Sequence, residues 1–126
     1  MGLPATACDV LRGTQDLTPV LFTSPHSGSL YPEDLTSKLQ VPLMDLRRTE
    51  DAFVDELFAS ATDAGASLIT ANYARTYVDL NRDARELDVS MFKDGLPRQS
   101  GLPGTRVKAG LGCFCLLYTS PSPRDA

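Results

Sequence analysis

Short apolar runs separated by loops rich in proline, glycine and serine mark most of the chain. Residues 19–24 form an apolar, β-prone run that predicts a buried strand, and residues 66–71 predict a second strand. Residues 76–80 predict a third, shorter strand. Residues 1–18 are expected to form a loose lead-in that includes one short edge strand.

Helices are expected between the first two strands. Pro32 is suited to the first turn of a short helix, because its backbone has no N–H to leave unpaired there. A longer helix is predicted to begin at Thr49, a good N-cap, and to stop at Gly65. A buried stripe on that helix is predicted from the apolar residues at helical spacing, which are Phe53, Val54, Leu57, Phe58, Ala61 and Ala64.

The order strand, helix, strand over residues 19–71 is typical of a βαβ unit, in which the two strands are parallel. The pattern therefore predicts the α/β fold class. Farther along, residues 94–112 are dense in glycine and proline and predict a long irregular loop, either functional or disordered.

The C-terminal end differs in composition from the rest. Residues 115–126 resemble a translated sequencing adapter, so we expect them to be non-native and to pack against nothing. The alternative is an ordinary disordered terminus rich in serine and proline. The predicted domain thus covers residues 1–112, and residues 113–126 are assigned to the tail.

Composition narrows the class of protein. The chain has 126 residues, 42% hydrophobic and 22% charged, which fits one globular domain or a fragment of a larger one. A net charge of −4 argues against nucleic-acid binding, and no apolar run approaches the ~20 residues that span a membrane. Three cysteines do not suggest a disulfide framework, so a cytoplasmic location is expected, and the short spacing of Cys113 and Cys115 is a weak metal signal.

The candidate chemistry begins with His26, the single histidine of the chain. It follows the first predicted strand, and ligands of open α/β sheets bind at the carboxyl ends of strands. Asp51, at the predicted start of the long helix, could share a divalent cation with His26, and Glu50 is its possible substitute. A catalytic zinc takes three protein ligands, so the site would be incomplete in this chain. The alternative is that His26 only makes hydrogen bonds within its loop.

A second cluster follows the third predicted strand. Arg82 presents a planar fork that binds carboxylates through two hydrogen bonds, and Asn81 could add an amide hydrogen bond. Arg75 lies at the other end of the same segment. The alternative is a surface ion pair of Arg82 with Asp79 or Asp83, which contributes about 0–1 kcal/mol.

Three segments carry a resemblance to a known family: Ser24-Pro25-His26-Ser27-Gly28 with Tyr31-Pro32, Glu50-Asp51-Ala52-Phe53-Val54-Asp55, and Arg75-Thr76-Tyr77-Val78-Asp79-Leu80-Asn81-Arg82. In order and spacing, residues 19–95 resemble the N-formylglutamate amidohydrolases. The resemblance implies a fold similar to zinc carboxypeptidases (phosphorylase/hydrolase-like), a three-layer sandwich with a mixed, mostly parallel sheet, truncated here. It also implies zinc-dependent hydrolysis of N-formyl-L-glutamate, or of a related N-acyl amino acid, to formate and glutamate in histidine degradation.

The resemblance assigns roles to the residues already singled out. His26 and Asp51 resemble metal ligands, and Arg82 and Asn81, with help from Arg75, resemble the element that grips the substrate carboxylate. Family members are longer, so a further zinc ligand and the catalytic acid/base are expected in a C-terminal half that this chain lacks. The fragment alone is therefore expected to be inactive. The rival hypothesis is a non-catalytic, metal-free module that binds a small-molecule carboxylate through Arg75 and Arg82.

Overall fold

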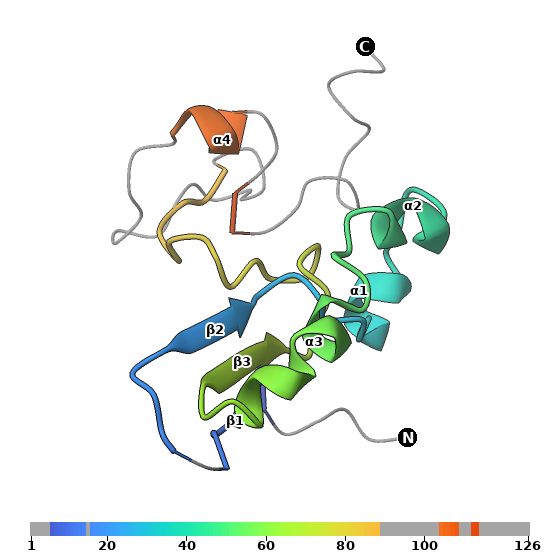
Figure 1. Ribbon diagram of the computed structural model, residues 1–126. Helices are drawn as coiled ribbons and strands as arrows, with labels where there is room; N and C mark the ends of the chain where they lie inside the picture. The colour runs from blue at the N-terminus through green and yellow to red at the C-terminus, as the bar shows by residue number, and fades with distance from the viewer. Residues whose placement is uncertain (1–5, 15, 89–103, 109–111, 114–126) are drawn as a thin grey trace.

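The computed structural model describes residues 6–14, 16–88, 104–108 and 112–113. The strands of this part form one mixed sheet in the order β1-β3-β2 (Figure 1). β1 (Cys8–Leu11) is antiparallel to β3 (Ser67–Ala71), and β2 (Leu21–Ser24) is parallel to β3. The α/β class and the mixed sheet are thus confirmed. The three-layer, mostly parallel arrangement stays a prediction.

The strands fall where the apolar runs predict them. β2 and β3 pair in register, with Phe22 opposite Leu68. The edge strand expected in the lead-in is β1, whose Val10 lies opposite Ile69. The parallel pair places the carboxyl ends of β2 and β3 at the same edge of the sheet, which is the edge where a binding site is expected.

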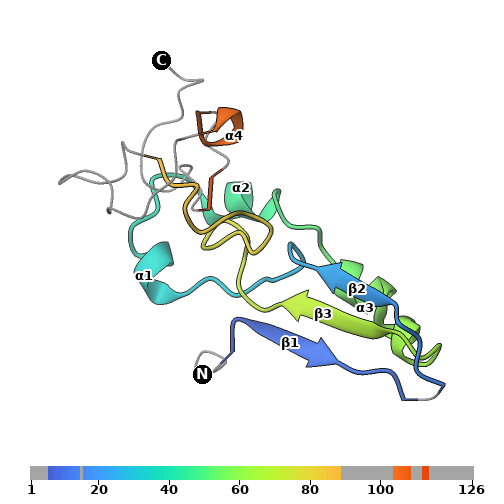
Figure 2. The ribbon, with the colours of Figure 1, turned by 90° about the vertical axis from the view of Figure 1, so that its left-hand side faces the viewer.

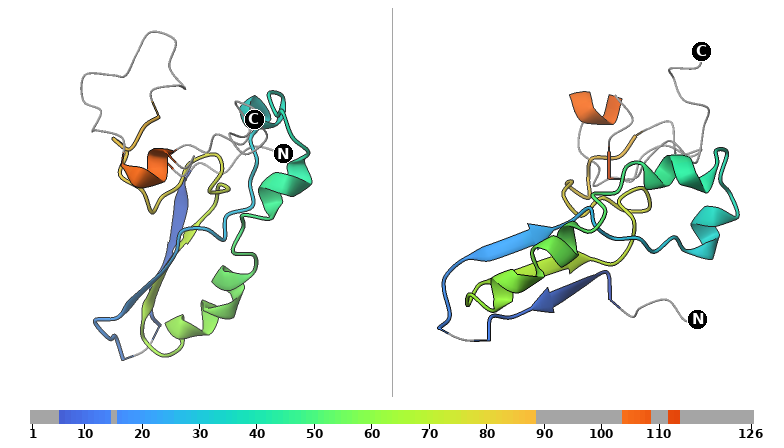
Figure 3. Two further views of the ribbon diagram at one scale, coloured as in Figure 1. Left: turned by 90° about the horizontal axis from the view of Figure 1, so that it is seen from above. Right: turned by 45° about the vertical axis from the view of Figure 1, so that its right-hand side comes forward.

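The connection between β2 and β3 contains α1 (Glu33–Thr36), α2 (Leu43–Arg47), α3 (Val54–Leu57) and a 3-10 turn, η1 (Ala59–Thr62). The short helix after Pro32 is confirmed as α1. Figures 1 and 2 show α1 and α2 beyond the carboxyl ends of β2 and β3. The views in Figure 3 show α3 lying along one face of the sheet.

The predicted single helix from Thr49 to Gly65 is wrong. The Thr49 hydroxyl donates to the carbonyl oxygen of Leu46 at 2.7 Å, so Thr49 follows the end of α2 instead of capping a new helix. Phe53 has a φ of 64°, in the left-handed region that helices exclude, and α3 begins only after it. Gly65 does follow the last helical turn, with the positive φ of 83° expected of a glycine there.

The predicted buried stripe on that helix is wrong as well. Phe53 and Leu57 are 71% and 73% exposed, because α3 is a single turn and its register is lost before η1 begins. Phe58 packs on Phe22 of β2, with ring centroids 5.4 Å apart. The core lies elsewhere, and its most buried large side chains are Leu35, Leu46, Leu68 and Val107.

Residues 76–80 form turns instead of the predicted strand. The amide of Tyr77 donates to the carbonyl oxygen of Ala74 at 2.9 Å, and that of Arg82 donates to Asp79 at 3.2 Å. The amide of Asp79 bonds the carbonyl oxygen of Cys113 at 2.9 Å. Local turns and one long-range bond thus take up the donors that a sheet ladder would need, despite the β propensity of this segment.

Most of the irregular loop predicted at 94–112 lies outside the described residues. Where it is described, the prediction is wrong at α4 (Thr105–Lys108), a helical turn whose Val107 is 1% exposed. Cys113 is buried against the domain, and residues 114–126, with Cys115 and the rest of the tail, lie outside the described part. No helix of the described segments is long and apolar enough to cross a membrane.

Candidate metal centre

The loop after β2 holds His26 in place. The Ser24 hydroxyl donates to the Ser27 hydroxyl at 2.8 Å, and Ser27 donates to the carbonyl oxygen of Ser24 at 3.2 Å, which closes a tight buried turn. A Cβ atom on Gly28 would lie 2.1 Å from the carbonyl oxygen of Tyr73, so only glycine allows the loop to lie this close to the segment after β3. The turn at Ser24 and Ser27 and the close approach of Gly28 to Tyr73 thus fix the position of the His26 loop.

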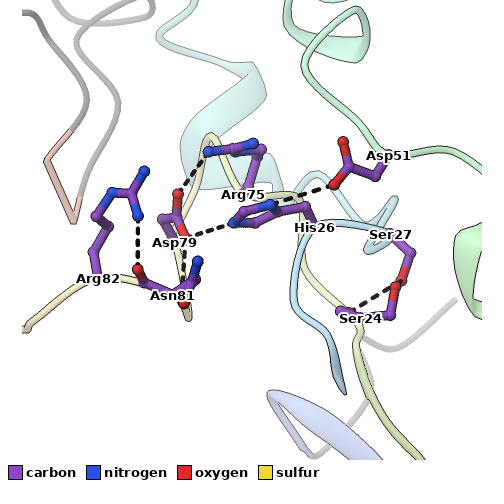
Figure 4. A network of polar contacts seen from close by, with 8 residues as sticks. All are labelled: Ser24, His26, Ser27, Asp51, Arg75, Asp79, Asn81 and Arg82. Atoms are coloured by element: carbon purple, nitrogen blue, oxygen red, sulfur yellow. Dashed lines mark hydrogen bonds and ion pairs between the residues drawn. The ribbon is translucent and has the colours of Figure 1, made fainter. Parts of the chain in front are cut away.

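His26 lies between two carboxylates (Figure 4). Its Nε2 is 2.9 Å from Oδ1 of Asp79, and its Nδ1 is 3.4 Å from Oδ2 of Asp51. The His26 side chain is 13% exposed, and its backbone carbonyl accepts the amide of Asp51 at 3.0 Å. The structure therefore brings His26 and Asp51 together, although Asp51 lies in a loop and not at the start of a long helix.

This arrangement leaves one imidazole nitrogen available to a cation. A neutral imidazole carries one N–H, so it can donate to one of the two carboxylates, and its lone pair then faces the other. A cation between Nδ1 and Asp51 would be attracted to both. Two ligand atoms on a tetrahedral zinc, with bonds of about 2.0–2.2 Å, lie about 3.4 Å apart. The 3.4 Å between Nδ1 and Oδ2 of Asp51 fits this spacing.

Asp79 is the central residue of the cluster, a role that was not predicted, since the sequence suggested it only as a surface partner for Arg82. Its side chain is 6% exposed and accepts hydrogen bonds from Nε2 of His26, Nη2 of Arg75 and the amide of Asn81, each at 2.9 Å. Burial by itself raises the pKa of Asp79, but these three donors outweigh it and lower the pKa below its usual value. Asp79 is therefore a buried, ionised acceptor.

The sequence does hold one signal for Asp79. An aspartate whose carboxylate accepts the amide two residues later is a common turn motif, and Asp79 with Asn81 has that spacing. The motif predicts a turn in place of a strand at this point. It does not predict burial, because the burial arises from His26 and Cys113, which are distant in the sequence.

The predicted carboxylate-binding residues flank Asp79. Arg75, 23% exposed, bonds Asp79, while Nη1 of Arg82 donates to the carbonyl oxygen of Asn81 at 2.8 Å (Figure 4). Asp83, the other rival partner for Arg82, forms an exposed ion pair with Arg85 at 2.6 Å. The three predicted residues thus lie in one cluster with His26, and their contact with a substrate stays a prediction.

Glu50 does not face His26. Its Oε1 accepts the Tyr31 hydroxyl at 2.5 Å and lies 3.3 Å from Nε of Arg47, and its side chain is 6% exposed. In this structure Asp51 is therefore the acid that contacts the imidazole, and a ligand role of Glu50 in its place stays a prediction. Within the described segments, no group of three or more His, Cys, Asp and Glu side chains could hold a metal ion.

The environment of Cys113 does not favour metal binding, and Cys115 lies outside the described residues. Burial, with the nearby charges of Asp79 and Glu86, raises the pKa of the Cys113 thiol, which disfavours the thiolate that binds metals. Its contribution to the site is through the backbone, since its carbonyl oxygen accepts the amide of Asp79.

The fold and this cluster define a class of protein: an α/β domain with a histidine and acids gathered at the carboxyl ends of parallel strands. The family model of N-formylglutamate amidohydrolase matches residues 18–117. The chain therefore belongs to the N-formylglutamate amidohydrolase family. The match includes all the residues of the cluster.

Individual relatives agree with this placement. The chain is 34% identical over 73 residues to a protein of Pseudomonas putida named N-formylglutamate deformylase, a match that covers 58% of this chain and 27% of that protein. The crystal structure of N-formylglutamate amidohydrolase from Ralstonia eutropha JMP134 is similar with a TM-score of 0.79 and 28% identity, over 86% of this chain and 38% of that one. The chain thus spans well under half the length of these relatives.

Proposed function

We propose that this chain is part of a zinc-dependent amidohydrolase that hydrolyses N-formyl-L-glutamate to formate and glutamate. Membership of the family and the names of both relatives support the reaction. The observation that supports a zinc site is the position of His26 between two carboxylates, with Nδ1 3.4 Å from Oδ2 of Asp51. A related N-acyl amino acid is the alternative substrate.

In this proposal, His26 and Asp51 are metal ligands through Nδ1 and Oδ2. Asp79 accepts a hydrogen bond from the N–H of Nε2, which fixes the tautomer and leaves the Nδ1 lone pair free for the metal. Arg75 and the amide of Asn81 keep Asp79 ionised and oriented for this task. A bound zinc would lower the pKa of its water towards about 7 and polarise the formyl carbonyl.

The substrate contributes carboxylates that an arginine fork can bind. We assign this contact to Arg82, with the side-chain amide of Asn81 beside it, because both lie next to Asp79 and hence near His26. Holding the glutamate end fixes the distance of the formyl group from the ligands, which is catalysis by positioning.

We further propose that the chain alone releases no formate. His26 and Asp51 supply two ligands, whereas a catalytic zinc takes three protein ligands and one water. The metal-free module that would bind a carboxylate through Arg75 and Arg82 is less well supported. Arg75 already donates to the buried Asp79, and the family placement favours a hydrolase.

A chimera tests the proposed reaction. Residues 18–117 replace the matching segment of the Pseudomonas putida N-formylglutamate deformylase, and formate release from N-formyl-L-glutamate is measured with and without a chelator. We expect zinc-dependent release that Asp51→Asn abolishes, while Asp45→Asn, at an exposed aspartate, leaves it unchanged. A chimera with an intact circular-dichroism spectrum that releases no formate contradicts the substrate. Full activity in the Asp51→Asn chimera contradicts the site.

A further inference from the structure

Asp51 needs help to keep its carboxylate in place. Its side chain is 54% exposed, so packing does not fix it as it fixes Asp79. Two hydrogen bonds hold its backbone: the amide of Asp51 donates to the carbonyl oxygen of His26 at 3.0 Å, and the carbonyl oxygen of Asp51 accepts the amide of Val54 at 3.3 Å. Of these two bonds, the first alone reaches the loop of His26, so a second attachment to that loop would help to hold the carboxylate towards Nδ1.

The neighbouring residue, Glu50, supplies that attachment. Its carboxylate is nearly inaccessible, 6% exposed, and accepts the Tyr31 hydroxyl at 2.5 Å beside Nε of Arg47 at 3.3 Å. Hydrogen bonds to a charged acceptor are short and roughly twice as strong as neutral ones. Burial and the hydrogen bond to Glu50 raise the pKa of Tyr31 far above its ordinary value, so its hydroxyl keeps the proton it donates. We call Tyr31, Arg47 and Glu50 the Glu50 clamp.

The clamp joins the two segments that carry the proposed ligands. Tyr31 belongs to the loop of His26, and that loop is fixed to the strand end: the amide of Leu30 donates to Asn72 at 3.1 Å and its carbonyl oxygen accepts the amide of Ala74 at 3.0 Å. Glu50 is covalently next to Asp51. The bond between Tyr31 and Glu50 therefore acts beside the bond between Asp51 and His26, and two cross-links to the loop of His26 restrict the orientation of the segment more than one.

We propose that Glu50 is a positioning residue, held by Tyr31 and Arg47, that sets the distance between the carboxylate of Asp51 and Nδ1 of His26. This inference rests on the proposed metal site. Residues that orient metal ligands typically change metal affinity by 10–100-fold when they are replaced. We expect loss of the Tyr31 hydroxyl to weaken zinc binding about 10-fold.

A zinc titration tests the clamp in the 126-residue chain. The probe is zinc chloride, and the readout is the imidazole ¹⁵N resonances of His26, which report on this site alone because the chain has one histidine. We expect Tyr31→Phe to raise the Kd about 10-fold. Glu50→Gln, which still accepts the Tyr31 hydroxyl, should raise it less than Glu50→Ala. The matched control is Tyr77→Phe, which removes another tyrosine-to-carboxylate hydrogen bond, 3.0 Å long to Asp34, and should leave the Kd unchanged.

Amide hydrogen exchange without metal separates the clamp from the metal site. Tyr31→Phe should speed exchange at Asp51, while Ser67, whose amide bonds Val20 in the sheet, exchanges as in the parent. An unchanged rate at Asp51 overturns the clamp, and so does an increase at Ser67 equal to that at Asp51, since the effect is then global. A parent chain whose His26 resonances ignore zinc refutes the metal site instead, and the exchange rates still decide the clamp.

Discussion

Two regions differ in how far their side chains are exposed to solvent: the polar end of the sheet, formed by His26 and Asp79 beyond the carboxyl ends of β2 and β3, and the outer side of α3, with Phe53 and Leu57. His26 and Asp79 at the polar end have side chains only 13% and 6% exposed, while Phe53 and Leu57 beside the sheet are 71% and 73% exposed. Charged residues are normally at the surface and large apolar ones inside, so these two regions depart from the common distribution, although the core of Leu35, Leu46, Leu68 and Val107 follows it. At the polar end, burial follows hydrogen bonds between segments of the chain instead of the apolar pattern.

Each region has a local cause. At the polar end, Asp79 links three segments of the chain: its carboxylate accepts hydrogen bonds from His26 and Arg75, and its amide donates to the carbonyl oxygen of Cys113. Beside the sheet, α3 is a single turn that follows the strained Phe53, so its apolar residues do not line up over β2 and β3. The polar end is thus held by hydrogen bonds between segments, whereas the outer residues of α3 have no comparable partners among the contacts described above.

The largest expected effect follows from breaking the polar end. Asp79→Ala leaves His26 and Arg75 without their shared acceptor, and removal of one partner of a buried ion pair costs about 4 kcal/mol. Urea unfolding should show a loss of this size. The control, Asp83→Ala, removes a similar bond to an arginine, but the pair with Arg85 is exposed, so no measurable change is expected. Equal unfolding curves for both variants would contradict the role of Asp79 as the buried centre.

Matched leucines test the apolar side. Leu46 at the end of α2 is 0% exposed, and Leu46→Ala should lower the free energy of unfolding by about 3 kcal/mol through lost burial and the cavity that remains. Leu57→Ala on α3 removes the same atoms from a side chain that is 73% exposed. It should change the free energy of unfolding by less than about 0.5 kcal/mol. Similar losses in the two variants would show that the outer side of α3 is covered in solution.

Acid should gradually reduce the contribution of Asp79 to the stability of the fold. The folded pKa of Asp79 is lowered, so the unfolded chain binds this proton more readily, and stability rises with pH in the range between the two values. The contribution is complete above the ordinary pKa of about 3.9 and is lost as pH falls through the lowered folded value. Urea unfolding from pH 6 to pH 2 should therefore be less steep in pH for Asp79→Asn than for the parent.

Asp83 provides the control for the acid range. Its hydrogen bonds to Arg85 hold the pKa of Asp83 at about 2, but this pair is exposed, and salt screens exposed charges. The slope that remains in 1 M salt should therefore come mainly from Asp79. A parent and an Asp79→Asn variant with the same slope would show that Asp79 is not held ionised by its partners.

Sequence patterns predicted the parts of the site that depend on strand ends. His26 follows a buried apolar run, and parallel pairing brings the ends of β2 and β3 together, so the meeting of His26 with a nearby acid could be anticipated. The role of Asp79 could not be anticipated, because the sequence does not distinguish a solvated aspartate from one that is buried against His26 and Arg75.

The ends of the helices were less predictable, because they depend on contacts that residue types do not reveal. Thr49 is a good N-cap by residue type, yet its hydroxyl bonds backward to Leu46, and the competing use of one side chain depends on where α2 ends. Phe53 has helical neighbours at good spacing, but the tether of Asp51 to His26 precedes it, and Phe53 itself adopts a left-handed conformation that no propensity favours. A local bond at the end of α2 decided the first position, and a tertiary bond precedes the second.

The most direct test of the central claim is the ¹⁵N NMR spectrum of the single histidine, recorded near pH 7.5 before and after zinc is added. We predict a proton on Nε2, bonded to Asp79, and a zinc-induced shift that is larger at Nδ1 than at Nε2 and that Asp51→Asn weakens. A zinc-induced shift that is larger at Nε2, or imidazole resonances that do not respond to millimolar zinc, would contradict the assignment of His26 and Asp51 as metal ligands with Asp79 as the acceptor behind them.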